Sequence, residues 1–193
     1  MRQRSAGFTI VELMVVLGIF GVLLVVGVPG FQNTLKNNRM ASEMSSLRSS
    51  LGNARSEAMA RRMPVRLCES ANGTACSTSN AWTSGYIAYA DEDDDNVLDA
   101  GEDVFMVQRI DLPDDVSLVF RNASNAVTSS TRFSSRGDSL GDFGHFVICD
   151  DRGETQARGL ALTAAGSARS LIDEDDPEDD IVNIPGGDDV SCP

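Results

Sequence analysis

The sequence predicts an α+β protein, in which one long N-terminal helix, half of it transmembrane, packs on a C-terminal antiparallel β domain. Three observations support this fold class. A run of 23 residues from Leu13 to Leu35 contains no charged side chain. A stripe of apolar side chains at helical spacing follows this run, and beyond Pro64 short apolar segments alternate with turn-forming residues. We therefore expect the helix over residues 8–63 and the β domain over residues 64–193.

The uncharged run predicts a membrane span over residues 8–35. At about 1.5 Å per residue, a helix of this length crosses a hydrocarbon core of about 30 Å. Arg2 and Arg4 precede the run, and no acidic residue occurs before Glu12. The positive-inside rule then keeps the N-terminus in the cytoplasm and exports everything after Leu35. A secretory signal would need a small-residue cleavage site after the run, and residues 28–31 do not supply one.

The segment Gly7-Phe8-Thr9-Ile10-Val11-Glu12-Leu13 follows a short basic leader. It resembles the class III leader of type IV prepilins and pseudopilins. The resemblance implies that a prepilin peptidase removes residues 1–7 by cutting between Gly7 and Phe8, and then N-methylates Phe8. It also implies that Glu12 pairs with the N-terminal amine of a neighbouring subunit during assembly, because a carboxylate in lipid is costly without a partner. The alternative is a plain single-span anchor with an incidental Glu12.

The helix is predicted to continue as an amphipathic half over residues 36–63. Its apolar or small residues recur at steps of four and three, which is the spacing of one helix face. The stripe consists of Met40, Met44, Leu47, Leu51, Ala54 and Ala58. Pro64 is expected to end the helix near Met63. Earlier in the helix, Pro29 removes a backbone hydrogen bond. That predicts either a fixed kink or the local unwinding that the resemblance implies for assembled pili.

After Pro64, strands are expected wherever apolar segments lie between turn residues. The candidates are residues 65–68, 86–90, 104–110, 117–121, 131–133, 146–149, 160–163 and 167–171. They suggest one antiparallel sheet or two small ones, with a hairpin around Gly166. The acidic run over residues 173–180 is expected to be a solvated loop.

The order of features in this half is similar to the GspH/FimT family of minor pilins and pseudopilins. These features include a Cys-bracketed loop, Trp82, Gly85-Tyr86-Ile87-Ala88-Tyr89 and Cys149-Asp150-Asp151-Arg152-Gly153. The resemblance implies a structural, non-enzymatic subunit that helps to initiate or cap a type IV pilus or a type II secretion pseudopilus. Its partners would be prepilin peptidase, other pilin-like subunits and the bacterial inner membrane, with the C-terminal domain in the periplasm.

The alternative function is a tip-exposed binding subunit, such as a DNA receptor. Some members of the family bind DNA through a Gly-Arg-x-Arg motif. The matching positions here are Gly166-Ser167-Ala168-Arg169, so only the second arginine is present. The formal net charge of the chain is −13. Since nucleic-acid binding needs cationic contacts to phosphate, this charge and the incomplete motif argue against nucleic acid as a partner.

Four cysteines lie in the segment that is predicted to be exported: Cys68, Cys76, Cys149 and Cys192. In an oxidising compartment they predict two disulfides, for which three pairings exist. We expect Cys68–Cys76, which would close a loop rich in turn formers, and Cys149–Cys192, which would fix the C-terminal tail. A zinc site built from all four is the alternative, but the spacing lacks the usual C-x-x-C pairs.

The segment from Asp91 to Glu102, hereafter the acidic loop, matches the twelve-residue spacing of an EF-hand calcium loop. Asp91, Asp93, Asp95, Val97 (through its carbonyl), Asp99 and Glu102 occupy the ligand positions. Position six is Asn96 instead of glycine, and no flanking helices are predicted. Calcium binding is therefore an expectation, with a solvated acidic hairpin loop as the alternative.

A second motif, Gly137-Asp138-Ser139-Leu140-Gly141, satisfies the G-x-S-x-G pattern of a nucleophile elbow. That elbow requires a strand before the serine and a helix after it. Turn-forming residues flank the motif on both sides, and His145 is the only histidine. We therefore expect a turn and no catalytic residue.

Overall fold

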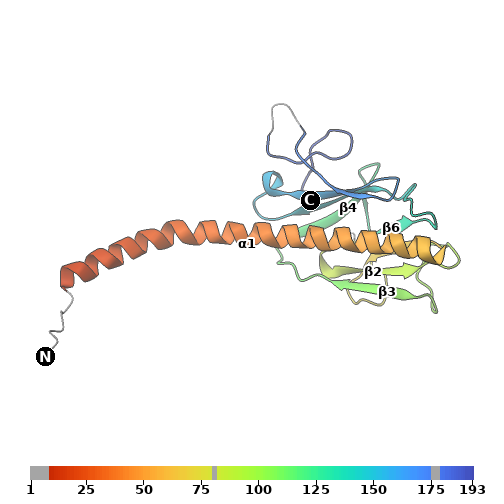
Figure 1. Cartoon of the computed structure of the whole chain (residues 1–193), viewed down its shortest axis with the longest axis horizontal. Coiled ribbons are helices and arrows are strands. Elements are labelled where there is room, and N and C mark those ends of the chain that lie inside the picture. The colour runs from red at the N-terminus through yellow and green to blue at the C-terminus, as the bar shows by residue number, and fades with distance from the viewer. Residues whose placement is uncertain (1–8, 80–81, 175–178) are drawn as a thin grey trace, which may run out of the picture. The chain divides into compact units, whose positions relative to one another are not determined.

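The computed structural model describes residues 9–79, 82–174 and 179–193. One long helix, α1 (Ile10–Arg61), precedes the strands (Figure 1). The strands are β1 (Val65–Glu69), β2 (Gly85–Ala90), β3 (Val104–Arg109), β4 (Ser117–Asn122), β5 (Val127–Thr128), β6 (Ser130–Phe133), β7 (Gly144–Cys149), β8 (Arg158–Leu162) and β9 (Ala168–Ser170). Short 3-10 helices, η1 (Trp82–Ser84) and η2 (Glu154–Gln156), lie between strands. The predicted fold class is confirmed.

The chain divides into two compact units, the first ending at Arg39 and the second running from Met40 to Pro193. In the first unit, the helix continues without interruption through Pro29, so the local unwinding is not present in this structure. The described large apolar side chains from Ile10 to Leu35 are 47–79% exposed. Within the described residues they belong to no packed cluster, and α1 is long and apolar enough to cross a membrane.

The helix ends at Arg61, two residues earlier than the sequence predicted. Arg62 has a positive φ of 59°. A residue in this left-handed conformation commonly follows the last helical residue and stops the helix. Pro64 adds a second constraint, because the residue before a proline avoids helical backbone angles.

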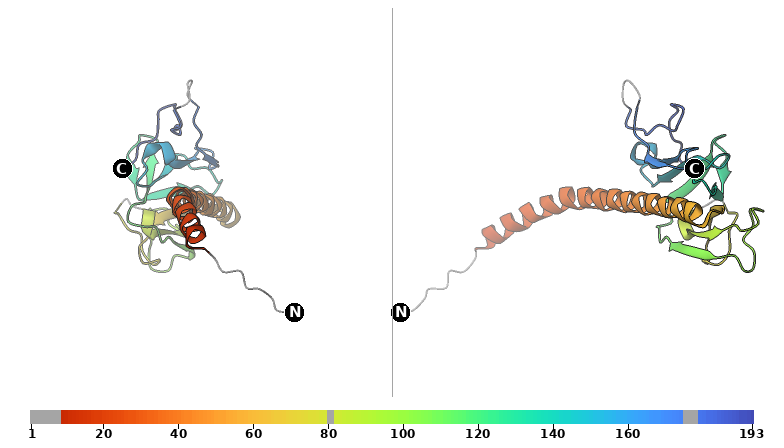
Figure 2. Two further views of the ribbon diagram at one scale, coloured as in Figure 1. Left: turned by 90° about the vertical axis from the view of Figure 1, so that its left-hand side faces the viewer. Right: turned by 45° about the vertical axis from the view of Figure 1, so that its right-hand side comes forward.

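Within the described residues, the strands of the second unit form two antiparallel sheets. Sheet A has the order β3-β2-β1-β6, and sheet B has the order β5-β4-β7-β8-β9. Only Ser129 separates β5 from β6, so the chain passes from one sheet to the other at that residue. The sequence missed β5, because a strand of two residues shows no alternation. Figure 2 shows β2 and β3 (green) apart from β7 to β9 (cyan to blue), with α1 beside both groups.

The main core lies where the second half of α1 meets the inner faces of both sheets. All six residues of the predicted stripe, from Met40 to Ala58, are at most 8% exposed. They pack with Trp82, Tyr86, Phe120 and Phe146 in one cluster. The rings of Trp82 and Phe146 are 5.0 Å apart in an edge-to-face arrangement, and the Trp82 indole N–H donates to the Thr128 carbonyl at 3.1 Å. Burial of these aromatic rings therefore ties both sheets to the helix.

The outer faces of the two sheets are covered by loops. On sheet B, Val119 and Val147 pack against the C-terminal segment, including Val190. On sheet A, Ile87 and Tyr89 pack against Leu98 of the acidic loop. The Cys149–Cys192 disulfide fixes the C-terminal cover of sheet B, whereas Cys68–Cys76 joins β1 of sheet A to the loop that follows this strand. These are the pairs that the sequence led us to expect.

The two disulfides should differ in their effect on stability, because they close loops of different length. Their sequence separations are 43 residues for Cys149–Cys192 and 8 residues for Cys68–Cys76. In the chain-entropy model, replacing the first pair by alanines should cost about 4 kcal/mol and replacing the second about 2.5 kcal/mol. Urea denaturation of both double variants would measure this. Equal losses, or a larger loss at Cys68–Cys76, would contradict the prediction.

Candidate functional site

The N-terminal end of α1 carries the first candidate site. Gly7 and Phe8, the predicted cleavage and methylation positions, lie outside the described residues. Thr9 caps the helix: its hydroxyl oxygen accepts a hydrogen bond from the Glu12 backbone N–H at 3.1 Å, and its carbonyl accepts one from Leu13 N–H at 3.1 Å. Thr9 and Glu12 therefore stand at the two ends of a capping-box sequence, S/T-x-x-E.

The capping box gives Glu12 a local role that the sequence analysis missed, although the spacing is visible there. Glu12 lies in the first turn of α1 and is exposed. In the first turn of a helix, the positive end of the helix dipole stabilises a negative charge. Glu12 is thus held on a regular helix, with no partner acid or base brought to it from elsewhere in the described residues.

The acidic loop connects β2 to β3, and Asp91 is its anchor. Asp91 is 0% exposed, and its two carboxylate oxygens accept hydrogen bonds from the N–H groups of Asp95 and Asn96, both at 3.2 Å. Burial raises the pKa of Asp91, and the bond from Asn96 opposes that rise. Asp94 and Asn96 have positive φ values of 62° and 72°. Asn96 thus adopts the left-handed conformation that a glycine provides at this position in an EF-hand.

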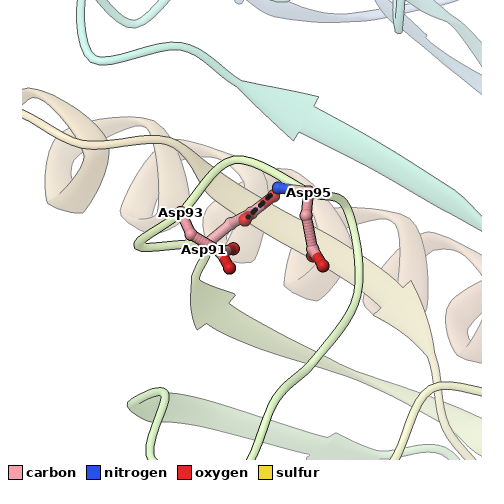
Figure 3. Close-up of side chains that lie close together, drawn as sticks. All are labelled: Asp91, Asp93 and Asp95. Carbon is pink, nitrogen blue, oxygen red and sulfur yellow. Dashed lines mark hydrogen bonds between the residues drawn. The ribbon is translucent and has the colours of Figure 1, made fainter.

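Three of the predicted calcium ligands converge. Asp91, Asp93 and Asp95 each offer a carboxylate oxygen, and these atoms lie within 4.8 Å of one another (Figure 3). Val97 and Asp99 are not part of this group. The Glu102 carboxylate is engaged elsewhere, since it accepts hydrogen bonds from the backbone N–H groups of Glu92 at 2.8 Å and Asp99 at 3.0 Å. The loop is flanked by strands, as expected, so it has EF-hand spacing without EF-hand helices.

Two arginines on sheet A hold the loop by residues that are not predicted ligands. Arg132 forms an ion pair with Asp94 at 2.6 Å, and Arg66 donates to the Asn96 side chain. Arg66 and Arg132 are direct partners on β1 and β6. Like charges opposite each other in a sheet repel, and the polar side chains of the loop offset that repulsion. The carboxylates of the loop repel one another, and the Arg132–Asp94 ion pair balances part of that charge without an ion.

The G-x-S-x-G segment is a packed turn, as predicted. Gly137 has a φ of 79°, and a Cβ atom there would meet the side chains of Met59 and Arg55. The Ser139 hydroxyl is buried and donates to the Arg132 carbonyl at 2.5 Å. His145 is buried in β7, and burial, followed by the charge of Arg121, lowers its pKa. Packing therefore accounts for Gly137, whereas Gly141 lies in open space with a positive φ of 90°.

The position corresponding to the DNA-binding motif lies in the β8–β9 turn. Gly166 has a φ of 74°, and a Cβ atom there would collide with the Gly137 carbonyl oxygen. Arg169 lies on β9 and is exposed. Packing of this turn therefore requires Gly166. Of the two arginines in the DNA-binding motif, only the one at position 169 is present.

Comparison with known proteins identifies the family. The model of a type II transport protein family, GspH, matches residues 43–166, and a prokaryotic N-terminal methylation motif matches residues 2–28. The chain belongs to the GspH family. Its members include minor pilins and pseudopilins of type IV pilus and type II secretion systems. No curated protein matches the sequence.

The fold of this GspH-family chain is similar to that of a solved type IV minor pilin. The type IV minor pilin FimU of Pseudomonas aeruginosa (strain PAO1), in space group P21, aligns with a TM-score of 0.51 and 17% identity, over 79% of this chain and 96% of its own. The minor pseudopilin EpsH of the type 2 secretion system of Vibrio cholerae aligns with a TM-score of 0.48 and 14% identity, over 71% and 99%. At these identities the likeness concerns the fold alone.

Calcium binding by the acidic loop stays a prediction, and melting experiments test it. If the ion binds only the folded state, stability should rise by about 2.7 kcal/mol when free calcium is a hundredfold above Kd. A domain beginning near Lys36 should therefore melt at a higher temperature in millimolar calcium than in chelator. Magnesium should have a smaller effect, because it requires a tighter octahedron of ligands.

Two variants separate the ligand groups in this experiment. Asp91→Ala with Glu102→Ala should abolish the calcium effect, since it removes both ends of the loop. Asp93→Asn with Asp95→Asn leaves the bonds to Asp91 and Glu102 in place and should weaken the effect through lost ligand charge. Identical wild-type melting in calcium and in chelator would establish a solvated acidic loop.

Proposed function

We propose that this chain is a structural subunit that helps to initiate or cap a type IV pilus or a type II secretion pseudopilus. The observation that carries the proposal is the first half of α1. Its described apolar side chains, from Ile10 to Leu35, are exposed around the whole circumference of the helix. A helix that is apolar on every side needs lipid or other apolar helices around it. The membrane provides the lipid, and a filament core of packed N-terminal helices provides the other apolar helices.

The proposed location is the bacterial inner membrane, with a single span and a periplasmic C-terminal domain. Arg2 and Arg4 before the span favour a cytoplasmic N-terminus. Both disulfides lie in the second unit, which fits an oxidising compartment. Prepilin peptidase would act at Gly7–Phe8 on the cytoplasmic side, before the subunit enters the filament.

Glu12 is proposed to select the position of the subunit in the filament. A carboxylate moved from the membrane surface into a helix bundle loses solvation and requires a counter-charge. The chain offers it none within the described residues, whereas cleavage after Gly7 would give every processed neighbour a new amine at Phe8. Pairing of Glu12 with that amine would favour one axial offset between adjacent helices.

Processing is tested by mass spectrometry of the mature protein purified from membranes. We expect an N-methylated Phe8 at the N-terminus, because the leader, glycine and aromatic residue stand in the order that the peptidase recognises. Gly7→Glu should leave residues 1–7 in place. A mature N-terminus after Ala6, or one near Gly30, would exclude processing as a prepilin.

The role of Glu12 is tested by Glu12→Val. Membrane insertion should be unchanged, because the span stays apolar, while incorporation into sheared pili or pseudopili should fall strongly. Thr9→Ala is the matched control, since it removes the capping hydroxyl but keeps the carboxylate, and it should incorporate normally. Normal incorporation of Glu12→Val would rule out the proposed pairing.

A further inference from the structure

The second unit contains a cavity of about 260 Å³ at one end of sheet B. It lies between the turn that joins β4 to β5, the start of β7, the end of β8 and the C-terminal segment. We call it the histidine cavity, and its mainly apolar lining includes Phe143, His145, Leu162, Ala164, Ile184 and Pro185. The C-terminal wall is held in place, because Cys192 is bonded to Cys149. The cavity is therefore pre-formed, as small-molecule sites usually are.

His145 is the polar group that distinguishes this cavity. Val147, two residues further along β7, packs on the outer face of sheet B, so His145 lies on the same face. The His145 side chain is 4% exposed, and neither ring nitrogen forms a hydrogen bond with the described part of the chain. The described side-chain atoms that are sealed from solvent without a partner are Glu69 Oε2, Arg121 Nε and Arg132 Nε, so the His145 nitrogens are not sealed. The accessible space that His145 lines is the cavity, and its nitrogens face it.

Two other polar side chains of the lining are already in use. The Asn122 side-chain oxygen accepts hydrogen bonds from the N–H groups of Ser124 and Ala126, both at 3.0 Å. The Thr163 hydroxyl shares a hydrogen bond of 2.8 Å with the Ser167 hydroxyl. A buried polar group without a partner is unfavourable, and a ligand that pairs with the imidazole would remove that cost.

The charge beside His145 selects the kind of group that can pair with it. Arg121 is its direct neighbour on β4. Burial, followed by the charge of Arg121, lowers the pKa of His145, so the ring is uncharged at neutral pH. An uncharged imidazole has one nitrogen that donates and one that accepts. A hydroxyl group can pair with either nitrogen, whereas the Arg121 guanidinium would repel an ammonium group.

We propose that the histidine cavity binds a small aromatic ring that carries a hydroxyl group. An apolar cavity of about 150 Å³ is enough for benzene, so the larger histidine cavity accommodates a ring with a substituent. The ring would pack on Phe143 and Leu162, and its hydroxyl would pair with His145. Both a free phenol and the tyrosine side chain of a partner protein offer this chemistry. The proposal goes beyond the filament role and does not depend on it.

Photolabelling of the full-length protein in detergent micelles tests the site. The probe is a phenol that carries a photoreactive diazirine, and mass spectrometry maps the labelled residues. We expect label within residues 122–125, 143–145, 162–164 or 184–185, and excess p-cresol should reduce it. Toluene should compete about fivefold less well than p-cresol, which is the effect of one hydrogen bond of ordinary strength. Benzylamine should not compete, because its ammonium group would meet the charge of Arg121.

His145→Phe isolates the hydrogen bond. It keeps a ring and removes both nitrogens, so labelling should persist while the advantage of p-cresol over toluene disappears. Comparing this ratio between the variant and the wild type cancels the partition of both compounds into micelles. Ala164→Leu should fill part of the cavity and remove the labelling. Ala165→Leu is the matched control, since Ala165 is exposed and does not line the cavity, and it should be labelled as the wild type is.

N-acetyltyrosinamide distinguishes the two sources of the ligand. Competition at least as strong as that of p-cresol would assign the cavity to a tyrosine side chain, and weaker competition would assign it to a free phenol. Label confined to α1 residues 10–35, or an equal ratio of p-cresol to toluene potency in the wild type and in His145→Phe, would overturn the proposal. None of these outcomes bears on the incorporation of Glu12→Val, which tests the proposed function separately.

Discussion

The packing of one helix face against two sheets is the constraint on which the second unit depends. Sheets A and B each have an apolar inner face, and residues of α1 from Met40 to Ala58 contribute to the core that both faces share. Trp82 lies in the same core, in contact with Tyr86 of sheet A and with Phe120 and Phe146 of sheet B. Because the helix and the aromatic cluster join the sheets, neither sheet can bury its apolar face alone.

The two halves of α1 differ in which of their apolar side chains are buried. From Ile10 to Leu35 the described large apolar side chains are exposed, which suits lipid or a bundle of like helices. From Met40 onward, the apolar side chains are confined to one stripe and are buried. A single helix thus links a segment that is long and apolar enough to cross a membrane to a folded domain.

Charge is distributed unevenly over the second unit, and local pairing determines which charges are available. Arg66 and Arg132 are used to hold the acidic loop at Asn96 and Asp94. This leaves Asp93 and Asp95 exposed on the outside of the loop. Arg48 and Arg158 are exposed and form no ion pair with the part of the chain that the structure describes. This strongly acidic protein therefore exposes charges of both signs on its second unit.

Local patterns determined most of the fold. The uncharged run, the stripe at steps of four and three, and Pro64 located α1 to within two residues of its C-terminal end, because helix formation depends on neighbouring residues. Local sequence also indicates the central residues of each candidate strand. It likewise contains the Thr9-x-x-Glu12 capping sequence, which the strand and helix patterns alone do not reveal.

Only the tertiary structure decided features that depend on residues far apart in sequence. The division of the strands between two sheets, the strand β5, and the pairing of Arg66 beside Arg132 arise from long-range register, which composition does not encode. The same is true of the acidic loop, where spacing predicted six ligands and the fold brought Asp91, Asp93 and Asp95 together while Glu102 bonded to backbone. The groove lined by Arg48 of α1 and Arg158 of β8 had no signature in the sequence, because these arginines are 110 residues apart.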